Sequence, residues 1–285
     1  MAAVYRGEKI TGSSSTWSGP VAKCQDGPKD EMSTERISAA PPEREPPENE
    51  NAPFGRLARR TIDQVERLFG WLHKWQRVEP SSQPVKVNLG SGLHVAPGWI
   101  NIDSSLKTLL ARLPQFALRW AYPLATVGDT NSRDEFVTLL RDHRFVFHNL
   151  KFGIPFRDSS VDFIFSSHVL HHLYREEALA LIREALRVLK PGGTMRITVP
   201  DLEVIVALYL EGRREQALKY FFYPKEQRSK LSRRCYQYDF VLLKGLMEEA
   251  GVRNVRRCKF REGRVPDLDR LDRLSRETLF VEGER

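Results

Sequence analysis

Short runs of β-branched and aromatic residues alternate with amphipathic stretches from residue 85 onward, and this alternation restricts the folds open to the chain. The order strand, helix, strand predicts a parallel sheet with helices on both faces, a doubly wound α/β architecture. No repeating unit is visible, which excludes solenoids and propellers. We expect strands at residues 85–89, 100–103, 145–149, 161–166, 194–199, 255–260 and 278–282, and helices at 106–113, 134–142, 175–189, 201–222 and 239–250.

The first part of the chain, residues 1–53, has a different composition. It holds seven prolines, carries six basic and nine acidic side chains, and shows almost no hydrophobic periodicity. Such a segment cannot bury enough apolar surface to offset the entropy lost on ordering. We interpret it as a disordered tail.

Residues 54–80 are expected to form an amphipathic helix and a linker ahead of the main domain, residues 81–285. Apolar residues between Leu57 and Trp75 recur at helical spacing, and basic residues occupy the polar positions. We expect this helix to pack across the domain as a lid. A helix lying on an anionic membrane is the alternative.

Cysteine usage and charge indicate the class of protein. Cys24, Cys235 and Cys258 are too few and too scattered for a disulfide scaffold or a zinc-cysteine site. No apolar run approaches the roughly 18 residues of a membrane span, and the N-terminus lacks the apolar core of a signal peptide. We therefore expect a cytoplasmic protein. Residues 54–285 carry 39 basic and 28 acidic side chains, a net charge of +11 that favours polyanions in general.

A glycine-rich loop follows the first expected strand, and an acid ends the second. Gly90 and Gly92 would let the backbone approach a ligand, and Asp103 could accept hydrogen bonds from both hydroxyls of a ribose. The next glycine, Gly98, comes six residues after Gly92, and Asp103 comes eleven residues after Gly92. In the dinucleotide fingerprint the third glycine is closer and the acid about 20 residues away. This spacing favours a nucleoside without phosphates over NAD.

These motifs resemble those of the class I S-adenosylmethionine-dependent methyltransferases. VNLGSG at residues 87–92 and PGWINID at residues 97–103 are similar to the first motif of a small, type-11-like branch, which looks like LNLGSG followed by PGWINID. Residues 149–173 look like the segment that joins its third and fourth strands. RVLKPGG at residues 187–193, YD at 238–239 and ETLFVE at 277–282 are similar to later signatures. The resemblance implies a Rossmann-like fold with a seven-stranded, mostly parallel sheet whose last strand is antiparallel, and S-adenosylmethionine as cofactor. Read physically, Lys190-Pro191-Gly192-Gly193 stops a helix, because proline cannot continue it.

The resemblance also implies a set of cofactor-binding residues. Asp103 would hold the ribose. Asn149 stands where the family often has an Asp facing the adenine; its oxygen can accept the same hydrogen bond without a charge. Leu150 would cover the ring or be a plain core leucine. Leu89, Gly90, Ser91 and Gly92 would line the methionine moiety, and Ser166 completes the cofactor-binding set.

The segment Ser166-Ser167-His168 leaves the sheet towards the point where the methyl group would be delivered. Transfer to a hydroxyl needs a base for the acceptor proton, and histidine is suited to that task. His168 is our first candidate for this base and Asp201 the second. His168, His171 and His172 could equally cap, pack and contact cofactor backbone. A metal site is not expected, because no carboxylate or cysteine complements these histidines.

The acceptor is expected to be a small molecule or a saccharide, including lipid-linked and polysaccharide precursors, methylated on oxygen. The saccharide class comes from the resemblance alone. The motif Asn/Asp-Pro-Pro-Tyr and a Pro-Cys nucleophile, typical of base methylation, are absent from the sequence, so a nucleic-acid acceptor is disfavoured. Two long insertions, residues 104–144 and 202–237, place aromatic residues beside cations on the expected acceptor side.

Three alternatives stay open at this point. A nicotinamide-dependent oxidoreductase would use a similar sheet. A cofactor-binding or scaffolding protein without turnover would explain Asn149 and the missing histidine before Tyr238. An RNA methyltransferase would bind its substrate with an affinity that falls steeply with salt.

Overall fold

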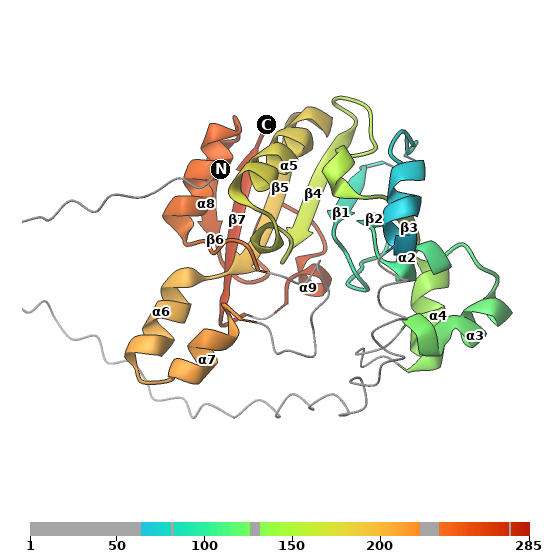
Figure 1. The fold of residues 1–285 in the computed structure, drawn as a ribbon. Coiled ribbons are helices and arrows are strands. Elements are labelled where there is room, and N and C mark those ends of the chain that lie inside the picture. The colour runs from blue at the N-terminus through green and yellow to red at the C-terminus, as the bar shows by residue number, and fades with distance from the viewer. Residues whose placement is uncertain (1–63, 81–82, 126–131, 223–233, 274) are drawn as a thin grey trace, which may run out of the picture. The chain divides into compact units, whose positions relative to one another are not determined.

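Seven strands build one sheet in the computed structural model of the protein, which describes residues 64–80, 83–125, 132–222, 234–273 and 275–285 (Figure 1). The predicted tail, residues 1–53, and the predicted helix before residue 64 lie outside this range. All seven predicted strands are present, with ends shifted by a few residues. They are β1 (Lys86–Leu89), β2 (Trp99–Asp103), β3 (Arg144–Phe147), β4 (Val161–Ser167), β5 (Leu189–Pro200), β6 (Arg253–Cys258) and β7 (Thr278–Glu284).

The strands follow the order β3-β2-β1-β4-β5-β7-β6. β1 pairs in parallel with β2 and β4, and β7 is antiparallel to both of its neighbours, which confirms the predicted doubly wound sheet with an antiparallel last strand. Leu89 is in register with Ile102 on one side and with Ser166 on the other. The loops that follow β1, β2 and β4 therefore leave the sheet at one edge, where α/β proteins bind their ligands.

The helices agree with the predictions except in three places. The predicted helix 201–222 is two helices, broken at Gly212, where φ is +85°. A helix at residues 115–125 was not predicted. A further short helix lies at residues 268–271. The described helices are residues 64–72, α2 (Leu106–Leu110), α3 (Gln115–Ala125), α4 (Arg133–Asp142), α5 (Arg175–Val188), α6 (Leu202–Leu210), α7 (Arg214–Lys219), α8 (Phe240–Glu249) and α9 (Leu268–Leu271), with 3-10 turns η2 (Leu150–Phe152) and η3 (Leu170–His172).

The segment Lys190–Gly193 follows the end of the helix, as predicted, but it is part of a strand and does not form a left-handed glycine cap. α5 already stops at Val188, and the four residues lie inside β5 as an excursion between two stretches that pair with β4. Leu189 pairs with Val161 and Thr194 with Phe163, so the register shifts across the excursion. Gly192 has φ of +77°, which suits the turn.

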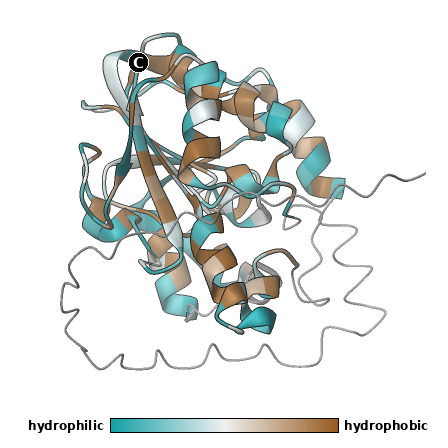
Figure 2. Ribbon diagram, turned by 90° about the vertical axis from the view of Figure 1, so that its left-hand side faces the viewer, coloured by the Kyte–Doolittle hydropathy of each residue, from teal (hydrophilic) through white to brown (hydrophobic). Residues whose placement is uncertain are grey.

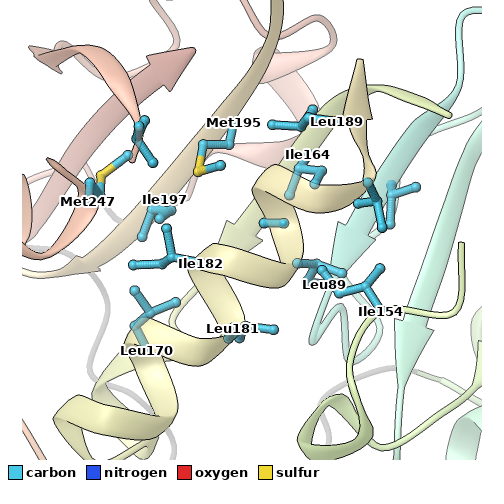
Figure 3. Packing of buried hydrophobic residues seen from close by; sticks show 14 of the residues in the cluster. Leu89, Ile154, Ile164, Leu170, Leu181, Ile182, Leu189, Met195, Ile197 and Met247 are labelled. Carbon is cyan, nitrogen blue, oxygen red and sulfur yellow. The ribbon is translucent and has the colours of Figure 1, made fainter. Parts of the chain in front are cut away.

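Apolar residues cover both faces of the sheet. On one face, Leu181 and Ile182 of α5 pack against the strands, as Figure 3 shows, and belong to the largest buried cluster. On the other face, Trp99 and Phe165 pack with Leu268 of α9. Hydrophobic residues accordingly follow the strands at the centre of the molecule in Figure 2. None of the described helices combines the length and apolar character that crossing a bilayer requires.

Candidate functional site

The loop after β1 is held against the end of β2 by its own backbone. The N–H groups of Gly90 and Ser91 both donate to the carbonyl oxygen of Ile102, at 2.8 and 3.3 Å. Gly90 has φ of +64°, and a Cβ added to it would lie 2.3 Å from Cγ2 of Val169. Gly92 has φ of +51° and open space beside it. Gly90 is thus needed for close packing, whereas Gly92 leaves room along the loop.

A buried asparagine supports the same loop, and the sequence analysis did not single it out. Asn88 of β1 donates from Nδ2 to the carbonyl oxygen of His94, at 2.7 Å, and to Oδ1 of Asn101 in β2, at 3.1 Å. Both asparagines are buried. An asparagine inside an otherwise apolar strand was the available signal, since a buried amide needs partners.

Asp103 ends β2 with its carboxylate turned towards this loop. Oδ2 accepts the N–H of Gly92 at 2.9 Å, and Oδ1 accepts the N–H of Ser105 at 2.7 Å. Each oxygen of a carboxylate can accept a further hydrogen bond, and the side chain is only half-buried. Asp103 can therefore fix the loop and still receive two hydroxyl groups.

The end of β3 lies beneath the helical segment 64–72. Asn149 caps η2 by accepting the N–H of Lys151 at 3.0 Å, which leaves its oxygen one further lone pair. A Cβ added to Gly70 would lie 3.4 Å from Cβ of Asn149. Leu150 is half-buried and packs against the main core. The helix thus covers the residue expected to face the adenine.

Two further polar residues, His148 and Gln76, form hydrogen bonds at the end of β3, and the sequence analysis missed both. His148 is buried; its Nε2 lies 3.1 Å from the carbonyl oxygen of Gly153, and its Nδ1 lies 3.3 Å from Nε2 of Gln76. Burial lowers the pKa of His148. Gln76 also donates to the carbonyl oxygen of Phe147 at 2.5 Å. Contacts this distant in sequence leave no local pattern, so only the structure reveals them.

His168 follows directly after β4 with a strained backbone. Its φ is +54°, and its N–H donates to the carbonyl oxygen of Thr198 at 2.8 Å. Non-glycine residues in this left-handed region are uncommon and concentrate at functional sites. Val169, the next residue, is the one that contacts Gly90. His168 therefore sits beside the glycine loop.

Buried side-chain atoms around the end of β4 have unmet hydrogen-bonding capacity. Oγ of Ser166, Nε2 of His168 and Nδ1 of His171 find no partner among the described residues. Burial, with Arg234 and His172 nearby, lowers the pKa of His168 to about 4, and burial also lowers the pKa of His171. Since orphaned buried polar atoms are rare in proteins, this cluster indicates a place for a polar ligand.

Asp201 lies at the carboxyl end of β5 and is already engaged. Its Oδ1 caps α6 by accepting the N–H of Glu203 at 3.0 Å, and its Oδ2 forms an ion pair with Arg257. Burial raises the pKa of Asp201, although Arg257 acts in the opposite direction. Tyr238 is buried and pairs with Asp201 through a β-bridge, and Asp239 caps α8. The YD motif is thus structural in this chain.

The second insertion begins with α6, whose N-cap is Asp201 and which exposes several apolar side chains. In α6, only Ile205 and Leu208 are buried, while Leu210 is 79 % exposed. Arg234 stacks on Tyr220, with its Cζ 5.4 Å from the ring centroid, and Cys235 donates its N–H to the carbonyl oxygen of His171 at 2.7 Å. The last part of the insertion therefore returns to the histidine cluster. Arg233 and residues 223–232 lie outside the described residues.

A separate cleft of about 390 Å³ lies at the opposite, amino-terminal ends of β4 and β5. Asp162, Lys190 and Arg264 line it together with Gly192 and Gly193. Asp162 is held by Lys190 at 2.8 Å and by the N–H of Val85 at 2.7 Å. In the described parts of the chain, no group of His, Cys, Asp or Glu side chains could hold a metal ion.

Comparison with known proteins gives a family match for part of the chain. A family model described as a methyltransferase domain matches residues 125–197, which run from the end of α3 through β3 and β4 into β5. The matched residues are therefore similar to a methyltransferase domain, in agreement with the resemblance of the sequence motifs. The glycine loop and Asp103 lie before the matched residues, so their assignment depends on the geometry described above.

Solved structures of methyltransferases are also similar to this chain. A methyltransferase of Thermotoga maritima, described as a possible histamine N-methyltransferase, is 15 % identical; the match covers 80 % of this chain and 98 % of that one, with a TM-score of 0.41. A methyltransferase of Aquifex aeolicus is 17 % identical, covering 82 % and 93 % of the two chains, with a TM-score of 0.37. Similarity at this level does not identify the acceptor.

The residues around the glycine loop fit S-adenosylmethionine, the cofactor that the resemblance of the sequence motifs implies. The free acceptor capacity of Asp103 suits ribose hydroxyls, and the space beside Gly92 suits a ligand that runs along the loop. The missing third glycine suits a nucleoside without a pyrophosphate, as does the lack of a helix in residues 90–98, between the end of β1 and the start of β2. Once bound, the cofactor supplies a methyl group on a positively charged sulfur.

Proposed function

We propose that this protein transfers a methyl group from S-adenosylmethionine to a hydroxyl oxygen of a small molecule or saccharide, a class that includes lipid-linked and polysaccharide precursors. The observation that carries the proposal is the position of His168. Its buried, unpartnered Nε2 lies at the end of β4, and the next residue contacts the glycine loop. The cytoplasm is the compartment that we propose for this activity, and the three scattered cysteines support it.

The chain's own residues supply alignment and a proton acceptor. Asp103, Gly90–Gly92 with Leu89 and Ser91, Asn149, Leu150 and Ser166 hold the cofactor. The acceptor hydroxyl lies in line with the methyl group, which removes much of the entropic barrier. Burial keeps His168 neutral at pH 7, so its Nε2 can accept the hydroxyl proton as the carbon–oxygen bond forms.

Asp201 is the second candidate for the base. Its carboxylate is shared between Arg257 and the N–H of Glu203, which leaves less capacity for an acceptor proton. The exposed apolar side chains of α6 and the stacking of Arg234 on Tyr220 support an acceptor that combines an apolar or ring face with polar groups.

The first test is calorimetric titration with S-adenosylmethionine and S-adenosylhomocysteine, with NAD and NADP as controls. We expect micromolar binding of the two sulfur nucleosides and none of the nicotinamide nucleotides. A screen of hydroxylated small molecules and saccharides, read by S-adenosylhomocysteine release, then tests turnover. Binding of NAD in place of the sulfur nucleosides would overturn the cofactor assignment at this site.

An RNA substrate is the competing acceptor, favoured only by the net charge of +11 on residues 54–285. It predicts RNA binding that weakens steeply with salt, because bound phosphates release counterions. Filter binding of RNA across a salt series separates the two substrate classes. Tight, salt-sensitive RNA binding combined with RNA-dependent turnover would replace the proposed acceptor.

A further inference from the structure

The helical segment 64–72 and the turn after it present apolar side chains on two sides. On the inner side, Phe69 and His73 pack against Phe147 of β3, with ring centroids 6.4 and 5.8 Å apart. On the outer side lie four apolar residues, spaced i, i+3, i+4 and i+7, which we call the outer stripe. They are Leu68, Trp71, Leu72 and Trp75, with exposed fractions of 56, 55, 56 and 83 %.

The outer stripe is too apolar to be an ordinary solvent-facing surface. A single exposed apolar residue needs no explanation, but four at helical spacing form a continuous strip. The inner side already anchors the helix to the sheet, so packing against the described residues does not account for the strip. Its two tryptophans are the side chains that proteins concentrate at membrane–water interfaces.

Cations border the outer stripe. The ammonium group of Lys74 lies 4.8 Å from the ring centroid of Trp71 and 5.3 Å from that of Trp75. Arg67 and Arg77 are exposed, and neither they nor Lys74 form an ion pair with a described acidic residue. A lysine beside exposed tryptophans can keep its ammonium group in water while its stem lies along apolar surface.

We propose that the outer stripe docks this protein on a lipid bilayer that contains anionic headgroups. The tryptophans and leucines would enter the interface, and Lys74, Arg67 and Arg77 would meet the negative lipids. The same cations disfavour a second copy of the chain as the occupant, because a symmetric contact would bring like charges together. The proposal stands independently of methyl transfer.

Docking through the outer stripe would bring the candidate site close to the membrane. The same helix covers Asn149 through Gly70, so docking brings the ligand-binding edge of the sheet close to the lipid surface. α3, whose neighbours α2 and α4 both contact β3, exposes two further aromatic side chains, Phe116 and Trp120. A lipid-attached substrate would then diffuse in two dimensions towards the site.

The test is co-sedimentation of the full chain with phosphatidylcholine vesicles that contain or lack phosphatidylglycerol. We expect binding only to the anionic vesicles, weakening as salt is raised. Replacing both stripe tryptophans, Trp71→Ala with Trp75→Ala, should reduce partitioning at least about tenfold, and Lys74→Glu about tenfold. Val241→Ser is the matched control, since Val241 is 72 % exposed on α8, outside the stripe.

Each alternative outcome overturns the proposal. No sedimentation with either vesicle would exclude a membrane partner, and equal binding to both would exclude recognition of anionic lipid. A dimer in light scattering that the tryptophan variant disrupts would assign the stripe to a second copy. Circular dichroism of every variant ensures that lost binding reflects the surface and not unfolding. Cofactor titration of the same samples keeps failure of docking separate from failure of the methyltransferase site.

Discussion

The two halves of the candidate site are built differently. Around the glycine loop, backbone N–H groups and carbonyl oxygens pair with one another, and both oxygens of Asp103 are engaged. Around the end of β4, side-chain atoms of Ser166, His168 and His171 are buried without a partner among the described residues. In the first region the hydrogen bonds are made within the protein and Asp103 keeps further acceptor capacity, whereas the second region has buried polar atoms that a ligand can meet. Under the proposed function, the cofactor would lie along the glycine loop and Asp103, and the acceptor would meet His168.

The largest effect is expected for His168→Ala, which should lower the turnover rate but not the affinity for the cofactor. His168→Ala should lower kcat by about 10²–10⁴-fold, because general-base catalysis contributes that much, while cofactor affinity changes less than about threefold. Turnover with an acceptor from the screen and calorimetry on the same sample measure the two quantities. Unchanged turnover would remove His168 from the role of base.

Two glycines of one loop offer a matched pair for the cofactor half. Gly90→Ala should destabilise the protein by about 3 kcal/mol, because the new Cβ meets Val169 and φ is positive, whereas Gly92→Ala should cost about 1 kcal/mol. Urea unfolding measures both. Adding Val169→Ala should recover part of the loss in Gly90→Ala; no recovery would mean that backbone strain, not the close contact, dominates.

Removing the carboxylate of Asp103 tests whether the glycine-loop region binds the cofactor. Asp103→Ala should weaken S-adenosylmethionine binding about 100-fold, since it removes hydrogen bonds to a charged group and releases the loop. Asp134→Ala, with its carboxylate exposed on α4, is the control and should leave the affinity unchanged. Equal affinities in calorimetry would place the ribose elsewhere.

The orphaned histidine predicts how stability depends on pH. Burial lowers the pKa of His168 from 6.5 to about 4, so below pH 6.5 the unfolded chain binds a proton that the folded protein excludes. Stability should therefore fall as the pH drops through this window, by about 2 kcal/mol at pH 5 from His168 alone. Urea unfolding at pH 7 and pH 5 should show that His168→Gln reduces the difference. An identical difference in wild type and variant would contradict the assignment.

The smallest effect concerns the second candidate base. Asp201→Asn should change kcat less than about threefold if His168 accepts the proton, because the amide oxygen can still cap α6. A loss of turnover as large as that in His168→Ala would make Asp201 the base. The amide of the Asp201→Asn variant does not titrate, so we expect no recovery of its kcat at higher pH. A recovery would indicate that the substitution acts indirectly.

The sequence predicted the sheet better than the helices around it. Alternating apolar runs are local, so all seven strands could be predicted, and the family resemblance supplied the direction of β7. The break at Gly212 has a local cause, because glycine accepts the positive φ at a helix end, but the apolar residues on both sides of it favoured one continuous helix in the prediction. The helix α3 lies in a continuous apolar stretch whose periodicity did not separate it from α2. The excursion at Lys190–Gly193 shows the same limit, because a proline and two glycines fit a helix end and a strand irregularity equally well.

For the site, motifs indicated which residues to examine but not their partners. Asp103 and Gly90 follow strands, so their meeting at one edge could be predicted from the parallel order. The ion pair of Asp201 with Arg257 and the contact of Gln76 with His148 join residues far apart in sequence, and no spacing rule predicts them. The strained φ of His168 is likewise visible only in the structure.

The place of β7 in the sheet has a consequence for the order of folding. β7 lies between β5 and β6, and among the described strands β6 pairs with β7 alone. During synthesis, strands β1 to β5 can pair as they emerge, but β6 must wait until residues 278–284 have left the ribosome. The half of the sheet that carries the glycine loop and His168 can therefore assemble first, and β6 joins last.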